Sequence, residues 1–207
     1  YSFLTLVIFA FLKFINLRTF DAFNFSLTII SSGGFLSTNN FDTLFSDNLS
    51  KFVLSILILF SYFSLFFSYN LFFFKKRNVN YLSEDLYLSI YLLLIISFIF
   101  IFFNIDNNFF NIFFSITSSV SNLGISFNDT PQNLSFIFLL LVIIGGSFFS
   151  TSSGLRFIKV ISLIKFSINN LLSHSKPNQV YMNKFSLFNS NTKNSDINKY
   201  FLTILIF

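Results

Sequence analysis

Residues 20–37 read FDAFNFSLTIISSGGFLS, a short apolar segment that runs into a small polar patch with two glycines. Residues 107–126, NNFFNIFFSITSSVSNLGIS, repeat this design. The polar ends, SSGGFLS (31–37) and SNLGIS (121–126), are called the first and second glycine patch. The chain has six glycines, and three of them lie in these patches without a catalytic acid, base or cysteine alongside. Since glycine permits unusual backbone angles, the patches predict a function for backbone carbonyl groups.

The composition is that of a membrane protein. Of 207 residues 54% are hydrophobic and only 10% charged, and the mean hydropathy is +0.72; a soluble domain carries about 25% charged residues. The absence of cysteine and the single histidine, His174, exclude disulfides, thiolate metal sites and multi-histidine metal sites. No motif offers paired acids or a nucleophile with its base, so we expect no enzyme and no cofactor.

Apolar runs predict the membrane spans, each of which needs about 20 residues. Residues 52–74 and 86–103 each suffice for one span. A third candidate, 131–156, is interrupted by GGSFFSTSSG at 145–154, called the serine loop, and the run 135–144 before it is too short to cross. The chain begins and stops inside apolar stretches, so we expect it to be cut from a longer protein.

Residues 20–30 and 107–120 are semi-apolar and too short to span. We interpret both as half-helices that dip into the membrane and return. Asp21 is expected in the first turn of a helix that starts near Phe20, where the helix dipole favours an anion. Non-helical backbone at membrane depth is tolerated only when it is buried in protein or lines a water-filled cavity. The two glycine patches are therefore expected to line a cavity.

Charge predicts the orientation. Residues 20–50 and 104–131 lack Lys and Arg but hold five of the eight acids, whereas 75–77 and 156–176 hold seven of the thirteen basic residues. The positive-inside rule then places the basic segments in the cytoplasm and the glycine patches toward the outside, where acids would concentrate cations. The five acids are Asp21, Asp42, Asp47, Asp106 and Asp129. The seven basic residues are Lys75, Lys76, Arg77, Arg156, Lys159, Lys165 and Lys176. Three further basic residues, Lys13, Arg18 and Lys51, do not follow this distribution of charge. Arg156 and Lys159 are expected to be anchors at the cytoplasmic interface.

The layout repeats. A shift of 90 residues places 31–35 on 121–125 and Thr28 on Ser118. Each unit predicts an outer helix, a short re-entrant helix, a glycine patch and an inner helix with a basic end. Loops of this kind can form an ion filter, because backbone carbonyls can replace the water shell of an ion. A close helix–helix contact is the alternative for the patches, and a kink for the serine loop. The fold class predicted is an all-α polytopic membrane protein of helix–pore-helix–helix repeats with re-entrant filter loops.

These motifs carry a family resemblance. FDAFNFSLTIISSGGFLS (20–37) and FSITSSVSNLGIS (114–126) resemble the second and third pore regions of the Trk/Ktr/HKT superfamily of potassium transporters. IIGGSFFSTSSGLRFIKVISLIK (143–165) resembles the Gly-Gly-x-x-Gly-Ser-Thr-x-Gly-Gly-(Ile/Leu)-Lys signature of its inner helix. YLSEDLYLSIYLLL (81–94) fits the beginning of the third repeat, and HSKPNQVYMNKFSLF (174–188) is similar to the segment before the fourth repeat of TrkH-type members.

The resemblance implies four helix–pore–helix repeats around one potassium pathway. Residues 1–77 would be the second pore repeat with a truncated first helix, 78–172 the third with a gating loop, 173–198 a cytoplasmic linker, and 199–207 the start of the fourth. It further implies potassium uptake across the bacterial cytoplasmic (inner) membrane by a multi-pass homodimer with a cytoplasmic nucleotide-binding regulatory subunit of the TrkA type. Symport with protons or sodium and channel-like flow both stay open, and no nucleic acid is expected as a partner.

The resemblance also assigns site residues. Gly34 and Gly124 are the filter glycines, and Arg156 falls where the family has a loop lysine. Phe149 and Ser153 depart from the family, which has small residues or glycine there. The filter comprises Ser31, Ser32, Gly33, Gly34, Ser121, Asn122, Leu123 and Gly124, with potassium bound at Ser32, Gly33, Gly34, Asn122, Leu123 and Gly124; the gating loop comprises Gly145, Gly146, Ser147, Ser150, Thr151, Ser152, Ser153, Gly154 and Arg156.

A second function class stays open, a non-conducting hydrophobic subunit of an energy-transducing membrane complex. Such a subunit would usually carry acids or lysines buried within its spans as proton relays. The three main spans have none before Arg156, which counts against this class. Because only two of four filter strands are expected in this chain, we expect that the chain alone does not conduct.

Overall fold

The computed structural model describes residues 1–37, 41–45, 47–65, 67–68, 81–102, 109–127, 131–175, 185–187, 190–192, 199 and 202. Nearly all of them are helical or in short connections. The helices are α1 (Ser2–Phe14), α2 (Thr19–Ser31), α3 (Phe41–Leu44), α4 (Asn48–Tyr62), α6 (Tyr81–Phe102), α7 (Phe109–Val120), the 3₁₀ turn η1 (Gln132–Leu134), α8 (Ser135–Ile143) and α9 (Phe157–Ser175). Strands β1 (Phe185–Leu187) and β2 (Ser190–Thr192) form one antiparallel pair.

Several sequence predictions fall outside the described residues. These are the basic run 75–77, Asp106, Asp129, Lys176 and most of the final segment 199–207. Within the expected linker 173–198, α9 continues to Ser175 and therefore includes His174, and the strand pair follows. The boundaries of the two repeats, the linker and the fourth repeat stay predictions.

Helix α6 has the length and composition of a membrane span. Among the described residues, Glu84–Phe102 is the one helix long and apolar enough to cross a bilayer by itself. The predicted span 86–103 is therefore helical as far as Phe102 and has the length and composition of a span. Its outer face leaves Leu93, Leu94 and Ile101 more than half exposed, as expected for side chains that meet lipid.

The helix within the predicted span 52–74 is interrupted, and residues 69–74 of that span lie outside the described residues. Helix α4 begins before it, at Asn48, and ends at Tyr62, after which Phe63 is extended with φ −77° and ψ 164°. The carbonyl groups of Ser61 and Tyr62 do not continue the helix but accept N–H groups of the serine loop, described below. A partner far along the chain thus interrupts a segment that its apolar composition would allow to continue.

The short helices follow the sequence predictions closely. Helices α2 and α7 coincide with the half-helices expected at 20–30 and 107–120, and Asp21 lies in the first turn of α2. Whether they re-enter a membrane stays a prediction. Helix α8 ends at Ile143 and α9 begins at Phe157, so the serine loop does separate two helices.

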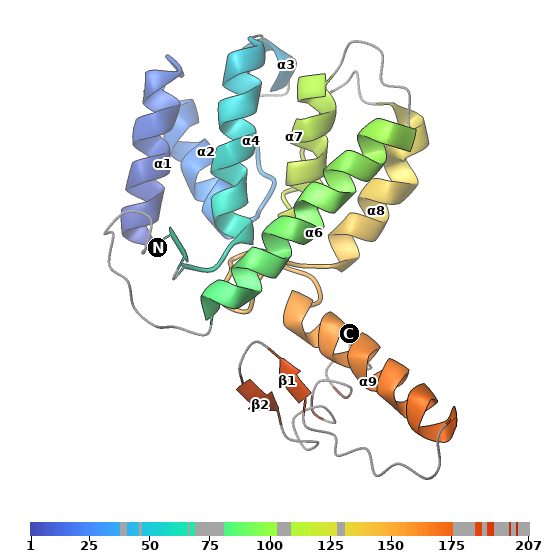
Figure 1. Ribbon diagram of the computed structural model, residues 1–207. Coiled ribbons are helices and arrows are strands. Elements are labelled where there is room, and N and C mark those ends of the chain that lie inside the picture. Colours follow the sequence, from blue (N-terminus) through green and yellow to red (C-terminus); the bar gives the residue numbers. More distant parts are fainter. Residues whose placement is uncertain are drawn as a thin grey trace.

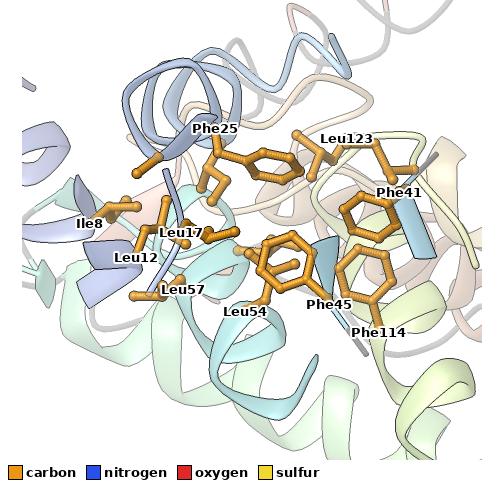
Figure 2. Close-up of a cluster of buried hydrophobic side chains, with 14 of the residues drawn as sticks. Ile8, Leu12, Leu17, Phe25, Phe41, Phe45, Leu54, Leu57, Phe114 and Leu123 are labelled. Carbon is orange, nitrogen blue, oxygen red and sulfur yellow. The ribbon is translucent and has the colours of Figure 1, made fainter. Parts of the chain in front are cut away.

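Two groups of helices meet along α4 and α7. Figure 1 shows α1, α2 and α4 beside one another, with α6, α7 and α8 forming the other group. The core of the first group contains rings of α2, α3 and α7, and Phe41 lies 5.7 Å from Phe25, 5.4 Å from Phe114 and 4.7 Å from Phe127, centre to centre. Leu123 of the second glycine patch belongs to the same cluster (Figure 2). This aromatic packing therefore fixes the second patch against α2.

Removal of the Phe114 ring tests this packing. Phe114 is fully buried, so Phe114→Ala leaves a cavity and is expected to lower the free energy of unfolding by about 3 kcal/mol. Phe136→Ala is the control, because its ring is 67% exposed and should change stability by less than about 0.5 kcal/mol. Chemical unfolding in detergent, followed by circular dichroism, measures both. Equal losses in the two variants would contradict the packing described.

Candidate functional site

The two glycine patches start with the same backbone geometry at the C-terminal ends of α2 and α7. Ser32 and Asn122 take left-handed angles, with φ of 50° and 60°. The N–H groups of Gly33 and Leu123 each bond to the carbonyl oxygen five residues earlier, at 3.2 and 2.9 Å. A left-handed residue with such a bond is a common way to stop a helix. The 90-residue register of the sequence thus extends to the backbone hydrogen bonds.

Hydroxyl groups on the two helices hold the far side of each patch. Thr28 Oγ1 donates to the Phe35 carbonyl oxygen at 2.9 Å. Ser118 Oγ accepts the Ile125 N–H at 3.0 Å. The two pairs occupy equivalent positions in the 90-residue register, although the hydroxyl donates in one and accepts in the other. Each patch is therefore closed onto its own helix by a side chain.

The two patches touch through their backbones. Gly34 and Gly124 have positive φ of 67° and 74°, where side chains are strained. A Cβ atom on Gly34 would overlap the carbonyl oxygen of Leu123, whereas one on Gly124 would have open space among the described residues. A carbonyl group of the second patch therefore lies directly against the backbone of the first, which only glycine allows.

Buried polar atoms without protein partners lie at the same two helix ends. Ser32 Oγ and both polar atoms of the Asn122 amide are buried and have no hydrogen-bond partner among the described residues. Leaving such groups unpaired costs about 1–3 kcal/mol each. Oxygen atoms in this situation are suited to a partner such as a water molecule or a cation.

The serine loop lies beside the second patch. Gly145 N–H bonds to the Leu155 carbonyl oxygen at 2.8 Å, which closes the base of the loop. A Cβ atom on Gly154 would come within 3.0 Å of Asn122 Nδ2, and one on Gly145 would overlap the loop backbone at Ser153. The glycines therefore allow the loop to fold tightly and to reach the end of the second patch.

The serine loop is bound to the interrupted end of α4. Ser61 O accepts the N–H groups of Thr151 and Ser152 at 3.1 and 3.2 Å, and Tyr62 O accepts that of Ser147 at 3.2 Å. Thr151 Oγ1 adds a further bond to Ser61 O at 3.2 Å. The last carbonyl groups of α4 thus pair with N–H groups of a loop far along the sequence, as burial requires.

Arg156, expected both as an interface anchor and as a gating-loop residue, binds the serine loop. Its Nη1 atom donates to three backbone carbonyl oxygens of the loop, those of Ser147, Ser150 and Ser152, at 3.2, 3.2 and 3.0 Å. It also lies 2.9 Å from Ser150 Oγ. The guanidinium therefore holds the loop by joining three of its carbonyl groups. Lys159, the second expected anchor, is half-buried at the start of α9.

The two departures from the family pattern lie at the edge of the loop. Phe149 is half-buried and packs edge-on against Phe148, with ring centres 5.0 Å apart. Its carbonyl oxygen accepts the Leu65 N–H at 3.3 Å. Ser153 is exposed. The fold therefore accommodates both residues without opening the hydrogen-bonded interior of the loop.

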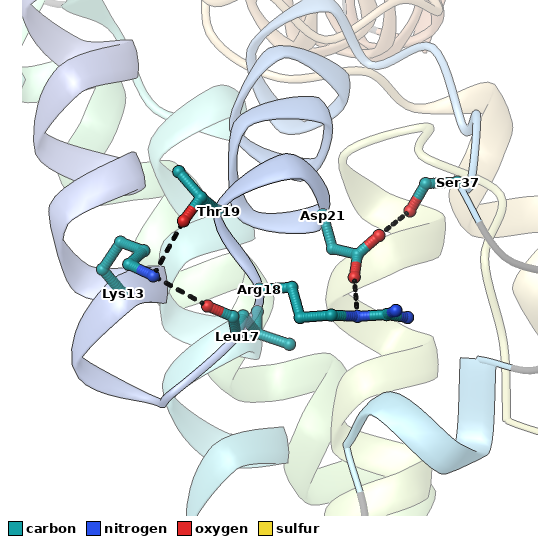
Figure 3. A network of polar contacts seen from close by, with 6 residues as sticks. All are labelled: Lys13, Leu17, Arg18, Thr19, Asp21 and Ser37. Atoms are coloured by element: carbon teal, nitrogen blue, oxygen red, sulfur yellow. Dashed lines mark hydrogen bonds and ion pairs between the residues drawn. The ribbon is translucent and has the colours of Figure 1, made fainter.

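The three basic residues that depart from the charge pattern each have a structural partner. Lys13 Nζ bonds to Leu17 O and to Thr19 Oγ1 at 3.2 Å each (Figure 3). Lys51 Nζ donates to Asn111 Oδ1 of α7 at 2.8 Å. It also lies 4.6 Å from the centre of a phenylalanine ring of the core cluster, in cation–π contact.

The third, Arg18, belongs to a network that reaches the first glycine patch. Arg18 Nε donates to Asp21 Oδ2 at 3.0 Å, and Ser37 Oγ donates to Asp21 Oδ1 at 2.6 Å (Figure 3). Asp21 is 3% exposed. The acid that begins α2 therefore also binds the end of the first patch.

Sequence reasoning missed two acids at the site. Glu84 and Asp85, at the start of α6, are 3% and 2% exposed and contact the serine loop and the end of α4. The predicted span 86–103 begins directly after them, at Leu86, and no role was assigned to either acid. The sequence feature that could have identified them is their position: two adjacent acids directly before a long apolar segment.

Arg156 supplies a test of the loop. Arg156→Met leaves three carbonyl groups of the loop with fewer donors and is expected to lower the free energy of unfolding by about 2 kcal/mol. Because all four contacts converge on one nitrogen, Arg156→Lys should retain most of the stability. Lys159→Met is the matched control and should change little. Unfolding in detergent measures all three, and a lysine variant as unstable as the methionine variant would contradict this geometry.

No protein-family model and no curated protein sequence matches the chain. Solved structures do match it, among them the crystal structure of the potassium transporter TrkH from Vibrio parahaemolyticus, with a TM-score of 0.79 at 18% identity over 98% of this chain. The match covers 46% of that transporter, so this chain spans about half its length. At this identity the likeness concerns the fold alone, and the fold is TrkH-like.

Proposed function

We propose that this chain supplies two filter loops of a potassium pathway, as the membrane subunit of a Trk-type uptake system. The observation that carries the proposal is the contact between Gly34 and the Leu123 carbonyl oxygen. It joins two backbone segments of the same geometry at the ends of two helices. The TrkH-like fold is a second support.

The chemistry of the pathway would be that of carbonyl groups. Helices α2 and α7 both have their C-terminal ends at the glycine patches. A helix C-terminus carries about half a negative charge, which favours a cation. The unpartnered Ser32 Oγ and the oxygen of the Asn122 amide add ligands of the type that potassium accepts. Potassium would then be held by backbone and neutral side-chain oxygens of residues 32–34 and 122–124.

The serine loop is proposed as the gate of this pathway. Its Gly154 lies against Asn122, at the helix end of the second patch. A loop in this position narrows the space next to the filter, and its tight hydrogen bonding would let it move between discrete arrangements. Phe149 and Ser153 lie on its outer edge, where they need not enter the pathway.

The competing class, a non-conducting subunit of an energy-transducing complex, has to be weighed again. Glu84 and Asp85 are buried at the start of α6, just before the predicted span 86–103, and are candidate relay acids that the argument from the spans did not consider. Both carboxyl groups, however, accept backbone N–H groups at 3.0 Å. Carboxyl groups held by such hydrogen bonds are better suited to a structural role than to proton relay. The transporter is therefore the favoured function class.

The wider setting follows from the resemblance and belongs to the same proposal. We expect a multi-pass protein of the bacterial cytoplasmic membrane that acts as a homodimer with a nucleotide-binding regulatory subunit. The remaining filter loops would come from sequence that flanks this chain, because the chain spans about half of the TrkH transporter. Coupling to protons or sodium is a separate question that uptake measurements can address.

Rubidium uptake tests the filter. The chain is expressed with its flanking coding sequence in a bacterium deficient in potassium uptake, next to Gly34→Ser, Gly124→Ser and Gly33→Ser. A side chain at positive φ costs about 1–2 kcal/mol, so Gly124→Ser should reduce uptake or discrimination against sodium about tenfold. Gly34→Ser should do more, because its Cβ also overlaps Leu123 O.

Gly33→Ser is the matched control. Its φ is not positive, and its Cβ would meet only side-chain atoms, Ser31 Oγ at 3.0 Å and the Phe35 ring at 3.2 Å, which can shift. A smaller effect is therefore expected at this position. Uptake that is absent in the parent, or indifferent to Gly34 and Gly124, would make the patches helix-packing sites and remove the main support of the proposal.

A further inference from the structure

Two adjacent acids lie buried at the start of α6, outside the residues assigned to the filter or the gate. Glu84 and Asp85 are 3% and 2% exposed. Within the described residues no Lys or Arg comes within ion-pair distance of either. Burying a carboxyl group is costly unless it is hydrogen-bonded, so the bonds that these two groups make decide what they do.

Asp85 holds the interrupted end of α4. Ser64 N–H donates to Asp85 Oδ1 at 3.0 Å, and the Ser64 hydroxyl donates to Asp85 Oδ2. Ser64 follows directly after the extended residue Phe63, where the helix has stopped. The carboxyl group of Asp85 therefore accepts a hydrogen bond from a backbone N–H group in the break that follows α4.

Glu84 holds the serine loop. Phe148 N–H donates to Glu84 Oε1 at 3.0 Å. Phe148 lies next to Ser147, which is fully buried and bonded to Tyr62 O. Arg156 binds the carbonyl groups of the same loop. The carboxyl group of Glu84 thus accepts a hydrogen bond from a loop N–H, while the guanidinium of Arg156 donates hydrogen bonds to loop carbonyls. An acid and a base therefore both bind the loop backbone.

The three segments form one hydrogen-bonded unit. The loop bonds to the end of α4 through Ser61 O and Tyr62 O, and Leu65 N–H returns a bond to Phe149 O at 3.3 Å. Glu84 and Asp85, being adjacent on α6, hold one partner each. The start of α6 is therefore the common support of the loop and of the broken helix.

We propose that Glu84 and Asp85 are positioning residues that hold the serine loop in its place beside the second glycine patch by fastening it and the end of α4 to α6. The proposal concerns the regulation of the pathway and rests on the proposed function for its consequence in transport. Loss of either acid frees the loop, while the glycine patches keep their own geometry.

Cysteine labelling tests the positioning without relying on transport. The chain has no cysteine, so Ser147→Cys introduces one thiol into it at a fully buried position of the loop, and any cysteine of the flanking sequence is first replaced by serine. A neutral maleimide is applied to membrane vesicles that contain the full chain with its flanking sequence. An unpaired buried N–H costs about 1–3 kcal/mol, so Glu84→Ala and Asp85→Ala should raise the labelling rate about tenfold. Glu84→Gln, which keeps an acceptor oxygen, should stay near the parent.

A second thiol separates local release from general loosening. Ser55→Cys, also fully buried and in the middle of α4, should label at the parental rate in every acid variant. Unchanged labelling of Ser147→Cys would overturn the proposal. An equal rise at Ser55→Cys would overturn it as well, because the acids would then only support the stability of the whole protein.

Rubidium uptake by the same acid variants tests the consequence. With a freed loop, uptake should rise several-fold at equal protein amount, with an unchanged KM and unchanged discrimination against sodium, because the filter is intact. If the parent takes up no rubidium, the proposed function fails, while labelling still decides whether the acids position the loop. Raised labelling without raised uptake in a parent that does transport would overturn the regulatory role.

Discussion

Backbone N–H and C=O groups at a buried helix end must find hydrogen-bond partners within the protein, because water does not reach them. This requirement shapes the centre of the molecule. Four helix ends meet there, those of α2, α4, α7 and α8. The ends of α2 and α7 use left-handed residues and their own hydroxyl side chains. The last carbonyl groups of α4 accept N–H groups of the serine loop, and the end of α8 accepts the Leu155 N–H at the base of the same loop.

Small and hydroxyl-bearing residues make this arrangement possible. At Gly34 and Gly146 a Cβ atom would overlap a carbonyl oxygen of another segment, Leu123 O and Tyr62 O respectively. Serine and threonine supply short donors and acceptors that do not widen the contacts. Among the described residues, Arg156 and Glu84 bind the serine loop, Asp85 binds the chain just after α4, and Asp21 binds the end of the first patch. The proposed pathway itself is lined by dipoles.

Local patterns predicted local structure well. The glycines and the following polar residues predicted the ends of α2 and α7, and the acid at position 21 predicted the start of α2. Interactions across the chain were not predictable in this way. The break in α4 at Phe63 depends on Thr151, which is 90 residues away from Ser61, and nothing in an apolar run signals it. The contacts of Arg156, Glu84 and Asp85 were not predicted, because sequence alone does not show the buried polar groups that they bind.

The most direct test is to locate the ion. Crystals of the protein with its flanking sequence, grown with thallium or rubidium in place of potassium, would show the cation by its anomalous scattering. A peak between the two glycine patches, within coordination distance of carbonyl oxygens of residues 32–34 and 122–124, is the result expected. Well-ordered patches without a cation peak, or carbonyl groups of both patches directed into helix contacts, would contradict the filter.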